Sequence, residues 1–269
     1  MVSPLPADLR RARIVERIRE DGVLRVAEAA LHFGVSEVTI RTDLAALEAV
    51  GLVRRGHGAA FPVPGGPREE PLERVSARDA ATKRAIGRRA AALVESGASV
   101  LLDVGSTTLA VAQALVERIL RGDLDDIVVI TNGLTIALAL EPAVPHITVA
   151  LTGGTLRPLQ HSLVDPGATE TLRDLHVDLA IVGCNGIDTD GRIMNLNLAE
   201  AGVKRAMIAA STAHLVVAES AKLGQRHLGG IGVVDERTTL VTAGEWTDTA
   251  AATGRALEAR GARVIRSDV

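Results

Sequence analysis

Aromatic side chains are almost absent from this chain of 269 residues, which has no Tyr, one Trp and two Phe. Its core must therefore be built from aliphatic residues, and hydrophobic residues make up 47% of the sequence. Proteins that bind single-stranded nucleic acid usually stack successive bases on aromatic rings. With only Trp246, Phe33 and Phe61 available, the chain is a poor candidate for that class.

Cysteine is equally scarce, because Cys184 is the only one. An internal disulfide is therefore impossible, and the composition suits a reducing compartment. We expect the Cys184 thiol to pack at the end of a strand rather than to react. The histidines lack the spacing of a metal site, so we expect no metal and no cofactor.

Long apolar runs are missing too, since no stretch approaches the ~20 residues that a membrane-spanning helix needs. No apolar segment follows the N-terminal arginines to form a signal peptide. We therefore expect a cytoplasmic protein with no membrane partner. The net charge is −3, which divides into +1 for residues 1–60 and −4 for the remainder. Charge alone does not indicate nucleic-acid binding.

The first 60 residues predict three helices followed by a β-hairpin. Apolar residues recur at helical spacing over 10–20, 26–33 and 37–50, and a glycine follows each segment closely. The third segment has an apolar face and a polar face, and residues 52–59 alternate around glycines like the wing of a winged helix. A helix of this kind, presented after a tight turn, can enter the DNA major groove. The alternative is a three-helix bundle whose third helix is simply solvated.

The polar face of the third helix and the hairpin supply the candidate DNA contacts. Arg41 can bond to a guanine edge with two hydrogen bonds, and the wing side chains suit phosphate. The candidates are Ser36, Glu37, Thr39, Arg41, Thr42, Arg54, Arg55 and His57.

Prolines and glycines between residues 62 and 71 predict a linker. We expect a winged helix-turn-helix domain over residues 1–60, a linker over 61–78 and an effector-sensing domain over 79–269. Beyond the linker, short apolar runs alternate with helical segments, which predicts a mainly parallel α/β sheet with helices on both faces. The expected strands cover residues 100–103, 127–131, 147–151, 179–182, 215–218, 239–242 and 264–266.

Four of these strands are followed by small or polar turns. Residues 103–108 join a strand to a helix, and such a turn can hold a phosphate on its backbone N–H groups. The alternative for Ser106 is a simple helix cap. The other turns cover residues 131–133, 153–155 and 183–186. Ligands of open α/β sheets bind at the carboxyl ends of strands, so we expect the four turns to surround one pocket, with residues 103–108 at the surface.

Charged residues on other segments complete the expected pocket. Glu200 and Lys204 lie one helical turn apart, and the alternative for them is an exposed ion pair worth ~0.2–0.5 kcal/mol. The candidate effector-binding residues are Lys83, Asp103, Gly105, Ser106, Thr107, Thr108, Asn132, Gly153, Gly154, Asn185, Glu200, Lys204 and Lys222.

The N-terminal segment resembles the DeoR family of transcriptional regulators. The matching residues are Val26-Ala27-Glu28, Phe33-Gly34-Val35-Ser36, Val38-Thr39-Ile40-Arg41, Asp43-Leu44, Leu47, Gly51-Leu52-Val53-Arg54-Arg55 and His57-Gly58. The chain departs from the family at Thr42, where a second arginine is usual, and at Ala59, where a second glycine is usual.

The C-terminal part resembles the sensor domain of the same family over residues 79–242. The matching features include Lys83, Asp103, Gly105-Ser106-Thr107-Thr108, Thr131-Asn132-Gly133, Gly153-Gly154, Glu200, Lys204 and Ser220-Ala221-Lys222. The resemblance implies a fold related to ribose 5-phosphate isomerase and a sugar phosphate held by Ser106, Thr107, Thr108 and Lys83. Residues 237–243 depart from the family pattern, so the resemblance leaves that edge of the pocket open.

The isomerase relation raises the alternative of a sugar-phosphate isomerase with an added N-terminal domain. That reaction needs a carboxylate base, and by the resemblance its position falls on Lys204, with only Glu200 nearby to substitute. We therefore expect no isomerase activity. The favoured hypothesis is a repressor of a sugar or carbohydrate operon that binds double-stranded operator DNA as a homo-oligomer, either a dimer or a tetramer, and responds to a small phosphorylated sugar. A winged helix that binds protein rather than DNA is a third alternative.

Overall fold

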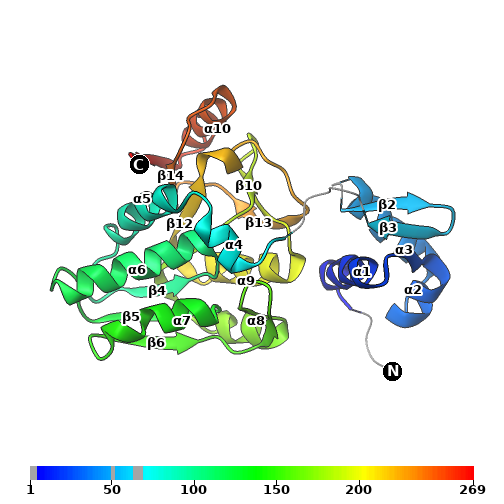
Figure 1. Cartoon of the computed structure of the whole chain (residues 1–269), viewed down its shortest axis with the longest axis horizontal. Coiled ribbons are helices and arrows are strands. Elements are labelled where there is room, and N and C mark those ends of the chain that lie inside the picture. Colours follow the sequence, from blue (N-terminus) through cyan, green and yellow to red (C-terminus); the bar gives the residue numbers. More distant parts are fainter. Residues whose placement is uncertain (1–4, 50–51, 63–68) are drawn as a thin grey trace.

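The computed structural model describes residues 5–49, 52–62 and 69–269, which form a small N-terminal domain and a larger α/β domain (Figure 1). The small domain consists of α1 (Ala7–Asp21), β1 (Leu24–Arg25), α2 (Val26–Phe33), α3 (Glu37–Ala49), β2 (Val53–Gly56) and β3 (Ala59–Pro62). Its three strands form an antiparallel sheet in the order β1-β3-β2. The predicted three helices and hairpin are confirmed, while β1 was not expected.

Glycines end the first two helices of this domain as the sequence predicts. Gly22 and Gly34 have φ values of +73° and +64°, in the left-handed region that glycine adopts without strain. The core is aliphatic apart from Phe33 and includes Ile14, Ile40 and Leu47, each with none of its surface exposed. Val50 and Gly51, which the sequence analysis placed at the end of the third helix, lie outside the described residues.

The large domain is built on a parallel sheet of seven strands in the order β15-β14-β12-β9-β4-β5-β6. All seven strands expected from the sequence belong to this sheet. They are β4 (Ser99–Leu102), β5 (Ile127–Thr131), β6 (Ile147–Leu151), β9 (Val177–Gly183), β12 (Ser211–Glu219), β14 (Thr238–Ala243) and β15 (Arg263–Ser267).

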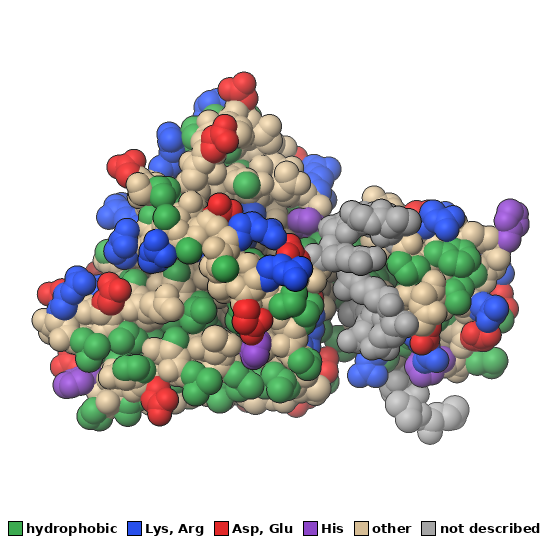
Figure 2. Space-filling view, viewed as in Figure 1, with side chains coloured by type: hydrophobic (Ala, Val, Ile, Leu, Met, Phe, Trp, Pro, Cys, Tyr) green, Lys and Arg blue, Asp and Glu red, His purple; other side chains and the backbone are tan. Residues whose placement is uncertain are grey.

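Helices cover both faces of this sheet, as predicted for an α/β fold. One face packs against α5 (Ala80–Ala91), α6 (Ser106–Leu120) and α7 (Leu134–Leu140), the last continued by η1 (Glu141–Ala143). The other packs against α8 (Pro166–Arg173), α9 (Leu198–Ala209) and α10 (Asp248–Glu258). Apolar side chains gather along the margin formed by α7 and β6 (Figure 2). The exposed apolar residues of this stretch of chain include Leu138, Val144 and Leu151.

Two small antiparallel sheets were not expected. One is the hairpin of β7 (Thr155–Arg157) and β8 (Ser162–Val164), and the other joins β10 (Gly186–Ile187), β11 (Arg192–Asn195) and β13 (Gly229–Val233). These strands have two to five residues, too few to show a period in the sequence. A short turn, η2 (Ser220–Lys222), follows β12.

The segment expected to be a linker is not irregular throughout. Strand β3 extends to Pro62, and α4 (Leu72–Ala77) lies against α6 with Leu72 buried. Residues 63–68 lie outside the described part of the chain. No helix among the described residues is long and apolar enough to span a bilayer.

Candidate functional site

The exposed face of α3 and the hairpin β2–β3 bring several DNA-binding candidates together. A groove of about 420 Å³ between them is lined by Arg41, Arg55 and His57, among others. Ser36 caps the helix, because its Oγ accepts a hydrogen bond from the Thr39 N–H at 3.1 Å. The polar face predicted for this helix is therefore exposed next to the wing.

Two arginines of this surface pair with carboxylates. Arg41 lies 2.7 Å from Glu37 and Arg55 lies 2.6 Å from Glu48. Exposed ion pairs of this kind contribute about 0–1 kcal/mol, so a DNA phosphate or base can compete for either guanidinium.

The remaining candidates on this surface make local contacts. Arg54 lies over the ring of Phe61, 5.2 Å from its centroid, and Thr42 donates to the Val38 carbonyl within α3. His57 is exposed on the hairpin. Arg54 and Thr42 thus have structural partners besides any DNA.

A buried acidic side chain on α3 supports this surface from behind. Asp43 accepts hydrogen bonds from Arg10 at 2.6 Å and from Arg11 at 2.8 Å, both on α1. The sequence analysis quoted Asp43 as part of the family resemblance but gave it no role, and it did not consider Arg10 or Arg11 as partners. An acidic residue inside the apolar face of an amphipathic helix was the signal that could have indicated a buried pair.

In the large domain, the four predicted turns follow four neighbouring strands, β6, β5, β4 and β9. Direct contacts join three of the turns. The Asp103 carboxylate accepts from the Gly183 N–H at 3.0 Å, and the Val104 N–H donates to the Asn132 side chain at 3.1 Å. The convergence predicted at the carboxyl end of the sheet is thus present for these three turns.

The fourth turn, Gly153-Gly154, packs the hairpin β7–β8 against α8. Gly154 has a φ of +111°, and a Cβ atom there would lie 2.4 Å from the Val164 carbonyl oxygen. Only glycine fits such an approach. The contacts at Gly154 are therefore packing contacts.

Asn132 and Asn185 hold backbone segments together. The Asn132 amide is fully buried and also donates to the Leu163 carbonyl at 3.4 Å. The Asn185 oxygen accepts from the Leu196 N–H at 2.9 Å. Both side chains position loops around the expected pocket.

The start of α6 is more buried than the sequence analysis expected. Thr107 and Thr108 expose 3% and 0% of their surface, so the expectation of a surface turn is wrong. The reason is the sheet order, which places β4 in the interior with a neighbour on each side. Gly105 has a φ of +138° and its carbonyl accepts from the Thr108 hydroxyl at 3.0 Å. Ser106 is half-buried at the first position of the helix.

Two buried oxygens at this helix start are not hydrogen-bonded. Thr107 Oγ1 and Asp103 Oδ1 have no partner within the part of the chain that the structure describes. Buried polar atoms are almost always paired in folded proteins. The two atoms lie where a strand ends and a helix begins, which is a place suited to an anion.

Lys204 forms a buried ion pair with Asp103, with Nζ 2.5 Å from Oδ2. Burial raises the pKa of Asp103 to about 6, although the Lys204 ammonium acts in the opposite direction. Burial also acts to lower the pKa of Lys204, but the carboxylates of Asp103 and Glu200 outweigh it, so the pKa lies above its ordinary value. Lys204 is therefore charged at neutral pH.

Two further lysines extend this cluster, because Lys222 interacts electrostatically with both Lys204 and Lys83. Lys83 is buried and lies 3.3 Å from Glu219, which is also near Lys222. Burial lowers the pKa of Lys222, and the neighbouring ammonium groups of Lys204 and Lys83 lower it further. Three amines thus share one region, an arrangement that favours a dianionic ligand.

Glu200 does not pair with Lys204, so the alternative of an exposed ion pair is wrong. The two side chains are buried and have different partners. The Glu200 carboxylate accepts from the Ser162 hydroxyl at 2.7 Å and from Arg157. Arg157 also reaches Glu69 at 2.6 Å. The sequence analysis missed Arg157 and Ser162, although both follow the predicted Gly153-Gly154 turn.

Cys184 is buried at the end of β9, as predicted. Burial raises the pKa of its thiol, which is the condition of an inert packing residue. The described residues hold no group of three or more potential metal ligands.

Comparison with known proteins covers both domains. Residues 10–62 match the DeoR-like helix-turn-helix domain, and residues 78–243 match the DeoR C-terminal sensor domain. A putative aga operon transcriptional repressor of Escherichia coli O157:H7 is 34% identical over 81% of this chain and 80% of its own. The transcriptional regulator GlpR of Haloferax volcanii is 33% identical over 89% and 91%, and the glycerol-3-phosphate regulon repressor of Escherichia coli K12 is 29% identical over 82% and 86%.

Among solved structures, the ribose 5-phosphate isomerase of Plasmodium falciparum covers 52% of this chain and 51% of its own, with a TM-score of 0.39 and 18% identity. The curated relatives carry the names of transcriptional regulators, which confirms the predicted regulator over the isomerase alternative. With both domains matched in order, the chain belongs to the DeoR family of helix-turn-helix transcriptional regulators.

Proposed function

We propose that this regulator represses a sugar or carbohydrate operon. A small phosphorylated sugar, bound between α6 and the three lysines, changes the affinity of the regulator for operator DNA. The observation that carries this proposal is the buried helix start of α6. It presents the Thr107 hydroxyl, which has no partner among the described residues, at the same strand end as the buried Asp103–Lys204 pair.

Charge and geometry support a phosphate rather than a neutral sugar at this place. A helix N-terminus carries a partial positive charge and unpaired N–H groups. Lys83, Lys204 and Lys222 add three cations, against the nearby carboxylates of Asp103 and Glu219. A third carboxylate, Glu200, also acts on Lys204 but is paired with Arg157. The names of the relatives, which include a glycerol-3-phosphate regulon repressor, agree with this class of effector.

A thermal-shift screen followed by calorimetry tests the ligand. The full chain should be stabilised by one or more phosphorylated sugars or by glycerol 3-phosphate, and not by the matching unphosphorylated compounds. Stabilisation by the unphosphorylated compounds alone would contradict the phosphate site.

DNA binding is tested with the promoter region next to the gene. Arg41→Ala should weaken specific binding by about 1–3 kcal/mol if Arg41 contacts a base. Arg55→Ala should weaken binding to all sequences and reduce the slope of log affinity against log salt by about one unit, as expected for one phosphate contact. Unchanged operator affinity in the Arg41 variant would refute its role in base recognition.

The proposal includes a homo-oligomer, a dimer or tetramer, in the cytoplasm. Two winged helices related by a twofold axis would match two half-sites on the DNA. Sedimentation of the full chain with and without operator DNA measures the subunit number, and a monomer bound to a single site would contradict it.

A further inference from the structure

The hairpin β7–β8 connects the candidate effector site to the segment that leads to the DNA-binding domain. Four pairs of described residues join residues 69–73 to this hairpin. Arg157 pairs with Glu69, and the Leu72 N–H donates to the Leu159 carbonyl at 3.1 Å. The Gln160 amide donates to the Glu70 carbonyl at 2.6 Å, and His161 contacts Glu73 at 2.8 Å.

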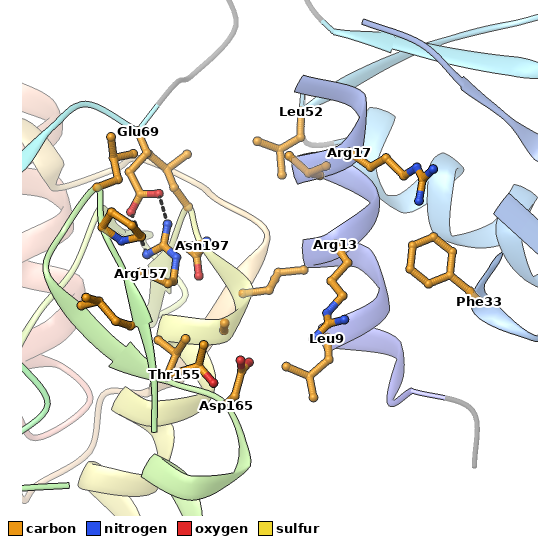
Figure 3. Close-up of a pocket in the computed structure, with 18 of the residues that line it drawn as sticks. Leu9, Arg13, Arg17, Phe33, Leu52, Glu69, Thr155, Arg157, Asp165 and Asn197 are labelled. Atoms are coloured by element: carbon orange, nitrogen blue, oxygen red, sulfur yellow. Dashed lines mark hydrogen bonds and ion pairs between the residues drawn. The ribbon is translucent and has the colours of Figure 1, made fainter. Parts of the chain in front are cut away.

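Arg157 contacts both the helix of the candidate effector site, α9, and the linker. Its Nη1 atom contacts Glu200. Its Nη2 atom lies 2.6 Å from Glu69, and Figure 3 shows this second pair. The side chains of the two carboxylates expose only 6% and 10% of their surface. Because both carboxylates share one partly desolvated guanidinium, a change at one carboxylate alters the strength of the interaction between Arg157 and the other.

Glu200 lies on the helix that carries Lys204, one turn away. The start of this helix is fixed by Asn197, whose side chain accepts from the Glu200 N–H at 3.0 Å. The Leu196 side chain just before it packs against the core of the N-terminal domain. The same short segment therefore touches the effector site, Arg157 and the DNA-binding domain.

A cavity of about 790 Å³ separates the two domains at this place. It is lined by Leu9 and Arg13 on α1 and, across from them, by Arg157, Asp165 and Asn197 (Figure 3). An interface with such a cavity is not tightly packed, so the orientation of the N-terminal domain depends on the few contacts around it.

We infer that Arg157 couples the effector site to the linker. Arg157 holds Glu69 of the linker while Glu200 is in its present position. A ligand that draws Glu200 or its helix toward the lysines weakens the contact between Arg157 and Glu69 and so loosens the linker. This inference rests on the proposed function for the identity of the ligand. The connection from Glu200 through Arg157 to Glu69 does not depend on that identity, because it is present in the protein without ligand. The mechanism requires only that the ligand binds the two arrangements with different affinity.

Hydrogen exchange of the full-length protein, without ligand or DNA, tests the coupling. Glu69→Gln should accelerate exchange of the Leu72 amide by about tenfold or more, because it breaks a buried pair. Glu70→Gln is the matched control, since Glu70 pairs with the exposed Arg78. Glu200→Gln is the decisive variant, because Glu200 reaches the linker through Arg157. Faster exchange at Leu72 in Glu200→Gln, with exchange in β12 unchanged, supports the coupling, and wild-type exchange at Leu72 overturns it.

A second measurement separates this inference from the proposed function. If glycerol 3-phosphate changes the operator affinity of the wild type, typical couplings predict a factor of about 5 to 150. Glu69→Gln should reduce this factor to about twofold or less, and Glu70→Gln should retain it. A full response in Glu69→Gln would overturn the coupling. A wild type without any response to sugar phosphates would count against the proposed function, while the exchange experiment still decides the role of Arg157.

Discussion

Replacing Thr107 with valine should make the protein more stable and a worse binder of its effector. Valine has nearly the shape of threonine but no hydroxyl. The Thr107 hydroxyl is buried and has no hydrogen-bond partner in the described part of the chain. An unsatisfied buried hydroxyl costs about 1–3 kcal/mol, and Thr107→Val removes that cost.

The expected gain can be measured as a melting temperature. For a domain of roughly 190 residues, 1 kcal/mol corresponds to a shift of about 2–4 °C, so the variant should melt at least about 2 °C higher. Thr108→Val is a matched control at the next position of the same helix. Its hydroxyl donates to the Gly105 carbonyl, so this variant should lose about 0.5–1.5 kcal/mol of stability.

Ligand affinity should change in the opposite direction. A hydrogen bond to a charged group contributes about 1.5–3 kcal/mol, so calorimetry on Thr107→Val should show binding of the sugar phosphate weakened by about 10- to 150-fold. A stabilised variant with unchanged affinity would show that the ligand does not use this hydroxyl. A destabilised Thr107→Val would show that the hydroxyl is satisfied in the folded protein, and the argument for a site at this helix start would fail.

Three further substitutions test other parts of the structure. Gly154→Ala places a Cβ 2.4 Å from the Val164 carbonyl at a φ of +111°, so denaturant titration should show a loss of about 1–3 kcal/mol or more, and an unchanged midpoint would contradict the packing described. Asp43→Asn leaves Arg10 without its buried carboxylate and should destabilise the N-terminal domain by about 3–5 kcal/mol. Circular dichroism on heating should then show loss of helical signal at a lower temperature, and a wild-type melting curve would refute this prediction. Burial raises the pKa of Asp103 from 3.8 to about 6, so the folded state binds a proton more tightly than the unfolded chain. The contribution of this group to the free energy of unfolding therefore falls by up to about 3 kcal/mol as the pH rises from 4 through 6. Asp103→Asn should remove that fall, and equal pH dependence of unfolding in variant and wild type would contradict the raised pKa.

The amino-acid sequence by itself determined the three helices and hairpin of the small domain, and the seven strands of the large sheet with helices between them. Apolar runs of three to five residues mark the strands of the large sheet, and helical spacing marks the helices between them. These signals are local, because each is contained in about ten consecutive residues. The turns after the strands could also be placed together, since parallel strands end at the same edge of a sheet.

Tertiary structure alone decided which side chains meet inside that edge. Arg157 contacts residues 88 and 43 positions away in the chain, and Lys204 contacts a residue 101 positions away. No local pattern encodes such partners, because they depend on the order of strands in the sheet and on a hairpin too short to show a period. The same reason explains the burial of Thr107, which a sequence of small polar residues made to look exposed. A long-range ion pair or an orphaned hydroxyl exists only once the sheet has brought distant segments together and removed the water around them.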